Sequence, residues 1–172
     1  GDRRLLGIAG DAGSGKTRLL HEAMARLRRD HHNVSMFLVR IEPARQTTRF
    51  SVLQELFCVV LGMDERDTDD EARAKLARLP ELGADENGAR AVRQLLGYAA
   101  REPEIGDSLD ASLRRVISRV GRRMAMARPM VMAFDGVESA DRASLRVLRS
   151  ILEQPERTPI LAILTYRPAP GQ

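Results

Sequence analysis

The stretch that decides the fold reads Gly10-Asp11-Ala12-Gly13-Ser14-Gly15-Lys16-Thr17 and matches the pattern GxxxxGK[ST] at each fixed position. It is preceded by a short apolar run at 4–9 and followed by apolar residues at helical spacing over 16–29. The pattern requires a strand, a glycine-rich turn and a helix in this order. A glycine-rich turn that matched the pattern by chance would not be expected between a strand and a helix. The stretch therefore predicts a loop whose backbone N–H groups bind phosphate at the start of a helix.

The side chains of this loop predict ATP with magnesium as the ligand. Lys16 is expected to be exposed in the loop, to pair only with the ligand and to place its charge on the β- and γ-phosphates. Thr17 is expected to ligate Mg²⁺ through its hydroxyl. The expected nucleotide-binding set covers the loop and one further residue: Gly10, Asp11, Ala12, Gly13, Ser14, Gly15, Lys16, Thr17 and Arg18. Asp11 and Ser14 stand at variable positions of the pattern, so their side chains receive no special role.

Four apolar runs predict the strands of a parallel sheet. The first, at 4–9, is expected to be buried, and 34–41 predicts a second strand after the helix. Strand, phosphate loop, helix, strand is the order of a parallel α/β unit. The continuous apolar runs at 129–134 and 159–164 predict two further buried strands.

Residues 42–128 contain no convincing strand and predict a helical insertion between the second and third strands. Helical spacing is present at 50–61, 70–79 and 89–101, and most clearly in an apolar stripe from Leu109 to Met124. Residues 80–88 and 102–107 are expected to be loops. The fold predicted for residues 1–172 is one three-layer α/β P-loop domain with a parallel sheet of at least four strands.

Two charged residues follow predicted strands and are candidates for the site. Asp135 ends the third strand, where a carboxylate could orient Mg²⁺ through its water shell, although a loop or helix-capping aspartate is the alternative. Arg167 follows the fourth strand, and strand ends in open parallel sheets point at the ligand. From position alone, a γ-phosphate sensor and a surface arginine before Pro168 are equally consistent with the sequence. Asp141 is predicted to be the N-cap of a helix whose inner face consists of Leu145, Leu148, Ile151 and Leu152.

Composition excludes several other classes of protein. The net charge is +4, but basic residues are spread among acidic ones and aromatics make up 3% of the chain, so we do not expect direct nucleic-acid binding by this segment. The single cysteine, Cys58, predicts a buried helical thiol without a chemical role. No apolar run is long enough to cross a bilayer and no targeting segment is visible, so a cytoplasmic location without membrane contact is expected.

At these motifs the chain resembles a known family. The segments GDAGSGKTRLLHEA, PMVMAFDGVESADRASLRVLRSIL and ILAILTYRP are similar to the phosphate loop, acidic strand and sensor strand of STAND-class AAA-related P-loop ATPases. Such modules occur in large LuxR-type transcription regulators and beside bacterial cyclase and protein kinase domains. The resemblance implies a strand order of 2-3-1-4 or 2-3-4-1, and we favour the second, in which the fourth strand lies between the first and third. It also favours Arg167 as the γ-phosphate sensor. It also implies that the family's C-terminal strand and lid are missing from this fragment of a larger protein, so that self-association through an open strand edge is expected.

The resemblance further implies slow hydrolysis. The family carries a second acidic residue directly after the magnesium aspartate, but Gly136 stands there, and the nearest carboxylate is Glu138. Losing a positioned base commonly costs about a hundredfold to ten-thousandfold in rate. Glu138 is the candidate replacement, with a solvent-facing glutamate in a turn as the alternative.

The resulting hypothesis is a regulatory ATP switch in signalling or transcription control, with slow hydrolysis and neighbouring domains of the same chain as output. The first alternative is a pseudo-ATPase interaction module that binds ATP or ADP without turnover. A small-molecule kinase is a weaker alternative because no acceptor-substrate site or arginine-rich lid is visible, and a nucleic-acid-binding protein is the weakest. The predicted catalytic set is Lys16, Asp135, Glu138 and Arg167, and the predicted magnesium ligands are Thr17 and Asp135.

Overall fold

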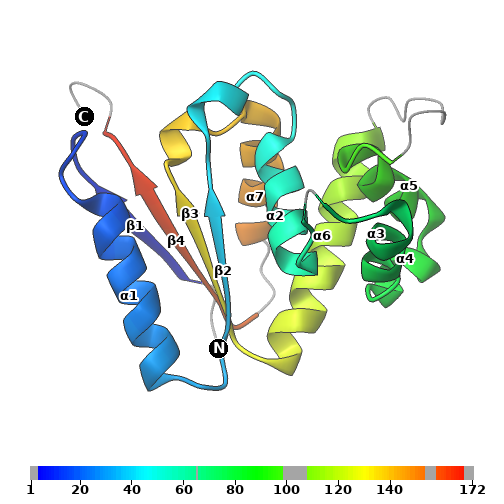
Figure 1. The fold of residues 1–172 in the computed structure, drawn as a ribbon, viewed down its shortest axis with the longest axis horizontal. Helices are drawn as coiled ribbons and strands as arrows, with labels where there is room; N and C mark the ends of the chain where they lie inside the picture. The colour runs from blue at the N-terminus through cyan, green and yellow to red at the C-terminus, as the bar shows by residue number, and fades with distance from the viewer. Residues whose placement is uncertain (1–3, 65, 99–107, 154–157, 169–172) are drawn as a thin grey trace.

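The structure is a computed structural model, and it describes residues 4–64, 66–98, 108–153 and 158–168. At its centre lies a sheet of four parallel strands in the order β1-β4-β3-β2. The strands are β1 (Arg4–Ala9), β2 (Ser35–Arg40), β3 (Met130–Asp135) and β4 (Ile160–Tyr166). Helices cover both faces of the sheet (Figure 1), so the predicted α/β class and the predicted position of the fourth strand are confirmed.

One face of the sheet is covered by the helix that follows the phosphate loop, α1 (Lys16–Asp30). Leu20 and Met24 of α1 are buried against Val131 and Ala133 of β3 and Ile163 of β4. These two helical residues are four positions apart and therefore share one face of the helix. Their burial fixes α1 along the sheet and holds its N-terminal end at the carboxyl edge of the strands.

The opposite face is covered by α2 (Ser51–Leu61), α6 (Ser108–Ala127) and α7 (Arg142–Leu152). The predicted apolar stripe of α6 is confirmed, since Leu109, Leu113, Val116, Ile117 and Val120 are all buried. The short helices α3 (Asp69–Leu76), α4 (Pro80–Ala84) and α5 (Glu86–Leu95) lie on the far side of α6 from the sheet (Figure 1). Together α2 to α6 form the helical insertion, which is entered from β2 through the 3₁₀ turn η1 (Pro43–Arg45).

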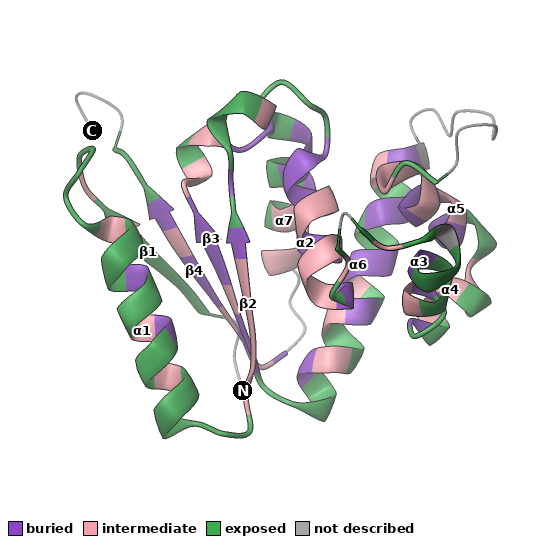
Figure 2. Ribbon diagram, viewed as in Figure 1, coloured by how far each residue is buried: buried purple, intermediate pink, exposed green. Residues whose placement is uncertain are grey.

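The prediction that the first strand is buried was wrong. β1 lies at the edge of the sheet, hydrogen-bonded to β4 alone, and most of its residues are exposed (Figure 2). Leu5 and Leu6 are 62% and 51% exposed. Apolar character at 4–9 indicated a strand correctly, but burial depends on what covers it, and that is a property of the tertiary structure.

The prediction of a loop at 80–88 was also wrong. Pro80 begins α4, and Asp85 caps α5 by accepting a hydrogen bond from the Gly88 N–H at 2.9 Å. A proline at the first helical position and an aspartate N-cap are both favourable helix starts, and they outweigh Gly83 and Gly88. The predicted loop at 102–107 and the last residues of the predicted helix 89–101 lie outside the described residues.

Cys58 lies on α2 as predicted, but its side chain is half-buried rather than fully buried. Burial raises the pKa of the Cys58 thiol, and the nearby Glu55 carboxylate adds to the increase. The thiol is therefore less ionised than an exposed one. That Cys58 has no chemical role stays a prediction. Within the described ranges, no helix has the length and apolar character needed to cross a membrane.

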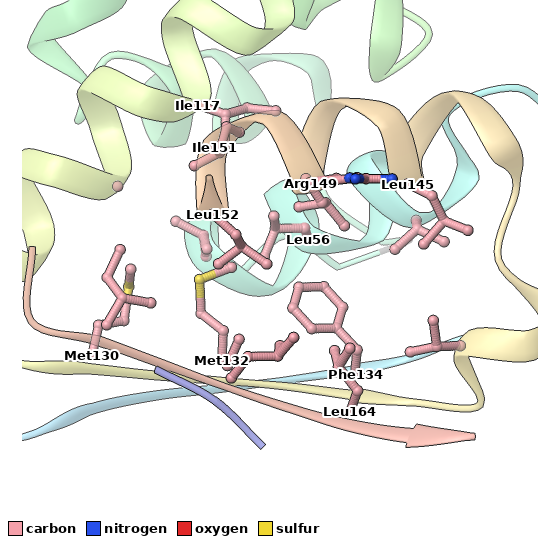
Figure 3. Close-up of a pocket in the computed structure, with 18 of the residues that line it drawn as sticks. Leu56, Ile117, Met130, Met132, Phe134, Leu145, Arg149, Ile151, Leu152 and Leu164 are labelled. Atoms are coloured by element: carbon pink, nitrogen blue, oxygen red, sulfur yellow. The ribbon is translucent and has the colours of Figure 1, made fainter. Parts of the chain in front are cut away.

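An apolar cavity of about 230 Å³ lies between the sheet and the helices of the second face. Met132, Phe134 and Leu164 rise from the strands towards Leu56 on α2 and Leu152 on α7 (Figure 3). The predicted inner face of α7 needs correction, because its fully buried residues are Ala143, Ser144 and Val147, whereas Leu145 is 36% exposed. The small residues allow α7 to lie close to α2, and the leucine row faces the less tightly filled space over the sheet.

Candidate nucleotide-binding site

A cleft of about 970 Å³ opens at the carboxyl edge of the sheet. Parallel α/β sheets bind their ligands at this edge. The phosphate loop and the first turn of α1 form one wall, and the ends of β2, β3 and β4 with the turns after β2 and β3 form the other. The lining residues are Ala12, Gly13, Gly15, Lys16, Thr17, Arg18, His21, Arg40, Ile41, Pro43, Asp135, Gly136, Glu138, Ser139, Thr165 and Arg167.

The shape of the phosphate loop depends on its glycines. Gly15 caps α1 with φ 86°, a left-handed conformation that a side chain would strain, and it has open space where a Cβ would lie. At Gly10 a Cβ would stand 2.6 Å from Ser14 Oγ, so a larger residue there would require the Ser14 hydroxyl to turn away. The first N–H groups of α1 have no intrahelical partner and stand at the positive end of the helix dipole. The loop is therefore built to receive an anion.

Lys16 is held by the loop itself. Its Nζ donates hydrogen bonds to the Gly10 and Asp11 carbonyl oxygens, each at 2.7 Å. The expectation that Lys16 is exposed and pairs only with ligand was wrong, because the side chain is half-buried and bonded to these carbonyls. Its ammonium is thus already placed beside the loop, where it could meet a phosphate.

A chain of hydrogen bonds links α1, β3 and β4 across the cleft. Thr17 Oγ1 donates to Asp135 Oδ1 at 3.2 Å, and Thr165 Oγ1 donates to the same oxygen at 2.5 Å. The Gly136 N–H donates to Thr165 Oγ1 at 2.8 Å. Asp135 is 8% exposed and Thr165 is 1% exposed. The two predicted magnesium ligands, Thr17 and Asp135, therefore lie in direct contact although 118 positions separate them in sequence.

The family model for the AAA ATPase domain matches residues 1–163 of the chain. The chain belongs to this family. No curated protein matches the chain in the corresponding comparison. Membership of an AAA ATPase family implies that the domain binds a nucleotide, usually with Mg²⁺, and that ATP and ADP are its ligands.

The residues of this AAA ATPase domain fit such a ligand. Four cationic side chains line the cleft, from Lys16, Arg18, Arg40 and Arg167, against the carboxylates of Asp135 and Glu138. The excess of positive charge suits a polyphosphate. A hydroxyl and a carboxylate side by side are oxygen ligands of the kind that Mg²⁺ takes when the phosphates complete its coordination.

The last two candidates of the sequence, Glu138 and Arg167, lie together at the mouth of the cleft. Arg167 Nε stands 3.4 Å from Glu138 Oε1, and their side chains are 60% and 28% exposed. Glu138 belongs to the 3₁₀ turn η2 (Val137–Ser139), which follows β3. Gly136, between Asp135 and this turn, has φ 86°, so the turn depends on glycine at that position.

The structure brings most of the predicted site together. Ala12, Gly13, Gly15, Lys16, Thr17 and Arg18 line the cleft. Gly10, Asp11 and Ser14 do not line it but shape the loop: the carbonyls of Gly10 and Asp11 hold Lys16, and the Ser14 N–H donates to the Asp11 carbonyl at 3.3 Å.

Sequence reasoning missed Thr165, Arg40 and His21. Arg40 lies opposite Asp135 in the register of β2 and β3, and His21 lies one turn beyond Thr17 on α1. The signal for Thr165 was present, because it is a polar residue near the end of an apolar strand, two positions before Arg167. Its contact with Asp135 depends on β3 and β4 being neighbours, which the sequence pattern alone does not establish.

Proposed function

We propose that this AAA ATPase domain is a regulatory switch that binds ATP with Mg²⁺, hydrolyses it slowly and passes its state to neighbouring domains of the same chain. The observation that carries the proposal is the Arg167–Glu138 ion pair, which joins a candidate phosphate sensor to a candidate base at the mouth of the cleft. Residues 1–172 are proposed to act as one P-loop domain of a larger protein in signalling or transcription control.

Binding is proposed to proceed through the loop residues in their predicted roles. The N–H groups of Gly13, Gly15 and the first turn of α1 bind the phosphates, and Lys16 supplies a positive charge at their outer end. Thr17 and Asp135 would hold Mg²⁺, which neutralises phosphate charge when bound. Thr165 keeps the Asp135 carboxylate turned towards Thr17 by its hydrogen bond.

The ion pair gives a physical basis for distinguishing ATP from ADP. A γ-phosphate in the cleft carries more charge than one carboxylate and offers several oxygens to a guanidinium. We therefore infer that ATP draws Arg167 away from Glu138, whereas ADP leaves the pair intact. Release of Glu138 would free its carboxylate to orient a water molecule, so sensing and hydrolysis share one rearrangement. An exposed ion pair contributes only about 0.2–1 kcal/mol, so it can be exchanged at little cost.

Calorimetric titration of ATP and ADP into two variants tests the switch. Arg167→Ala removes a charged hydrogen bond worth about 1.5–3 kcal/mol, so ATP affinity should fall roughly 10- to 150-fold while ADP affinity stays within about twofold. Glu138→Gln removes the carboxylate that competes with the γ-phosphate for Arg167, and it should tighten ATP binding up to about fivefold. Arg142→Ala, an exposed arginine at the start of α7, is the control. Equal losses for ATP and ADP in Arg167→Ala would mean that Arg167 is structural.

Slow hydrolysis is proposed because Gly136 provides no carboxylate directly after Asp135, and Glu138, the candidate replacement, must first be released by Arg167. In a phosphate-release assay, Glu138→Gln should lower the rate if Glu138 is the base. Gly136→Glu should not raise it, because a side chain is strained at φ 86° and would disturb the turn that carries Glu138. The alternative function, an interaction module without turnover, predicts a phosphate-release rate no higher than that of Lys16→Ala.

A further inference from the structure

The helices α2 and α7 begin close to each other, at the entrance to the helical insertion. α2 starts at Ser51, directly after the segment that leaves β2, and α7 starts at Arg142, directly after the turn that carries Glu138. Asp141 lies between these starts and is 3% exposed. Its carboxylate caps α7 by accepting the Ser144 N–H at 2.8 Å, as the sequence predicted.

The same carboxylate also caps α2, which the sequence did not predict. Asp141 Oδ1 accepts the Phe50 N–H at 2.9 Å, and Oδ2 accepts the Val52 N–H at 3.3 Å and the Ser51 hydroxyl at 3.2 Å. The next N–H of α2, that of Leu53, donates to Ser144 Oγ at 3.2 Å. The residue at the N-cap position of α2, Phe50, makes no side-chain cap of its own. The first turn of α2 is therefore completed by side chains that belong to α7.

This junction holds Phe50 in an unusual conformation. Phe50 has φ 63°, and among the described residues no other non-glycine has a positive φ. Such a conformation persists where the surroundings enforce it, and the Asp141 contact together with burial of the ring, 3% exposed, does so here. Burial would raise the pKa of the Asp141 carboxyl, but hydrogen bonds from Ser144, Phe50 and Val52 outweigh it and hold the pKa below its usual value.

The junction is continuous with the nucleotide cleft. Four residues separate Asp141 from Gly136, and Glu138 is one of them. Gln46, on the segment that leads from β2 to α2, donates its side-chain N–H to the Glu138 carbonyl at 3.3 Å. The Ile41 N–H donates to the Asp135 carbonyl at 2.9 Å. Residues 41–50 and residues 135–141 are thus two segments that run from the nucleotide cleft to the starts of α2 and α7 and are hydrogen-bonded to each other.

We propose that Asp141 is a positioning residue that couples the nucleotide cleft to the helical insertion. Because one carboxylate holds the first turns of both α7 and α2, a nucleotide-dependent change in the Glu138 turn alters the start of α2. The inference deepens the proposed function and rests on it: it names the route by which the state of the site reaches α2 to α6.

Amide hydrogen exchange with and without ATP and Mg²⁺ tests the coupling, with peptides covering 10–17 and 50–54 followed separately. In the unmodified chain ATP should slow exchange in both, and at 50–54 by at least about fivefold, the lower end of typical coupling between sites. Asp141→Asn retains one oxygen, enough to cap α7, but presents an NH₂ group to the Val52 N–H. In this variant the ATP-dependent slowing at 50–54 should fall towards onefold while that at 10–17 remains.

A purely structural role for Asp141 predicts a different result. Exchange at 50–54 in Asp141→Asn would then be faster by the same factor with and without ATP. The ratio of the exchange rates without and with ATP would equal that of the unmodified chain, and this result would overturn the proposal. Asp85→Asn is the matched control, since Asp85 also caps a helix and its side chain is 9% exposed, but it lies far from the cleft within the insertion. It should leave the ATP-dependent slowing at 50–54 intact.

The remaining outcomes are also decisive. If ATP protects 10–17 but not 50–54 in the unmodified chain, the coupling is wrong and nucleotide binding stands. If ATP protects neither and calorimetry detects no binding, the proposed function is wrong and the coupling falls with it. Should Asp141→Asn fail to fold, Ser144→Ala removes the acceptor of the Leu53 N–H and the hydrogen bond from the Ser144 hydroxyl to Asp141, but it leaves the Asp141 carboxylate in place. It should reduce in part the ratio of exchange rates at 50–54 without and with ATP, and no reduction would overturn the proposal.

Discussion

Replacing Thr165 with valine should test the hydrogen-bonded chain across the cleft, because valine has nearly the same shape and lacks only the hydroxyl. That hydroxyl donates to Asp135 Oδ1 at 2.5 Å and accepts the Gly136 N–H at 2.8 Å. Thr165 is 1% exposed, so a lost partner is not simply replaced by bulk water. The substitution therefore removes a donor from a carboxylate and leaves a backbone N–H without its acceptor.

The expected loss follows from these two contacts. A hydrogen bond to a charged group contributes about 1.5–3 kcal/mol, and a buried N–H left unpaired costs about 1–3 kcal/mol. Because Thr17 still donates to Asp135 and the cleft is open to water, we expect the lower part of the combined range, about 2.5–4 kcal/mol off the free energy of unfolding. At about 2–4 °C per kcal/mol for a domain of this size, Tm should fall by about 5–16 °C.

Urea unfolding of the unmodified chain, Thr165→Val and Thr165→Ser measures the effect. Thr165→Ser keeps the hydroxyl and should recover most of the stability. Ser150→Ala is a control, since the Ser150 hydroxyl only donates to a carbonyl within its own helix. A Thr165→Val chain within about 0.5 kcal/mol of the unmodified one, the usual range for surface substitutions, would show that the contact with Asp135 contributes nothing.

Three other perturbations follow from the structure. Lys16→Ala should weaken ATP binding roughly 10- to 150-fold in calorimetry, the value of a charged hydrogen bond, and unchanged affinity would remove Lys16 from the site. Leu6→Lys places a charge on the exposed edge strand β1 and should suppress self-association in light scattering at high concentration; an unmodified chain that stays monomeric there would refute the expectation. The pKa of Asp141 is below its value of about 3.9 in an unfolded chain, so its contribution is complete above that pH and is lost as pH falls towards the folded value. The gap in unfolding free energy between the unmodified chain and Asp141→Asn should therefore narrow on acidification below about pH 4, and a gap that widens would contradict this sign.

The parts of the fold that local chemistry determines could be predicted from the sequence. The phosphate loop, α1 and the run ending in Asp135 each carry a pattern within a few residues, and the structure places them as expected. The contact between Thr17 and Asp135 could also be anticipated, because the carboxyl ends of parallel strands meet at one edge.

Through-space relations could not be predicted in the same way. The exposure of the β1 side chains and the contact of Thr165 with Asp135 depend on how the strands are arranged in the described sheet. The resemblance indicated that β4 lies beside β3, but the local patterns at 4–9 and 159–164 did not. The second set of contacts made by Asp141 is a clearer case. A helix N-cap is a local pattern, but nothing near Asp141 in the sequence indicates that Phe50 and Val52, about 90 positions earlier, use the same carboxylate.

The cavity beneath α7 makes the two sides of the sheet mechanically unequal. On the α1 side, apolar side chains from helix and strands form one buried cluster, whereas on the α7 side a space of about 230 Å³ is bordered by flexible methionine and leucine side chains. Internal voids disappear when a chain unfolds, so they lower the volume of the unfolded state relative to the folded one. Hydrostatic pressure should therefore act first on the layer of α2, α6 and α7. We expect this difference in packing to make α7 easier to displace over the strands than α1, which carries the phosphate loop.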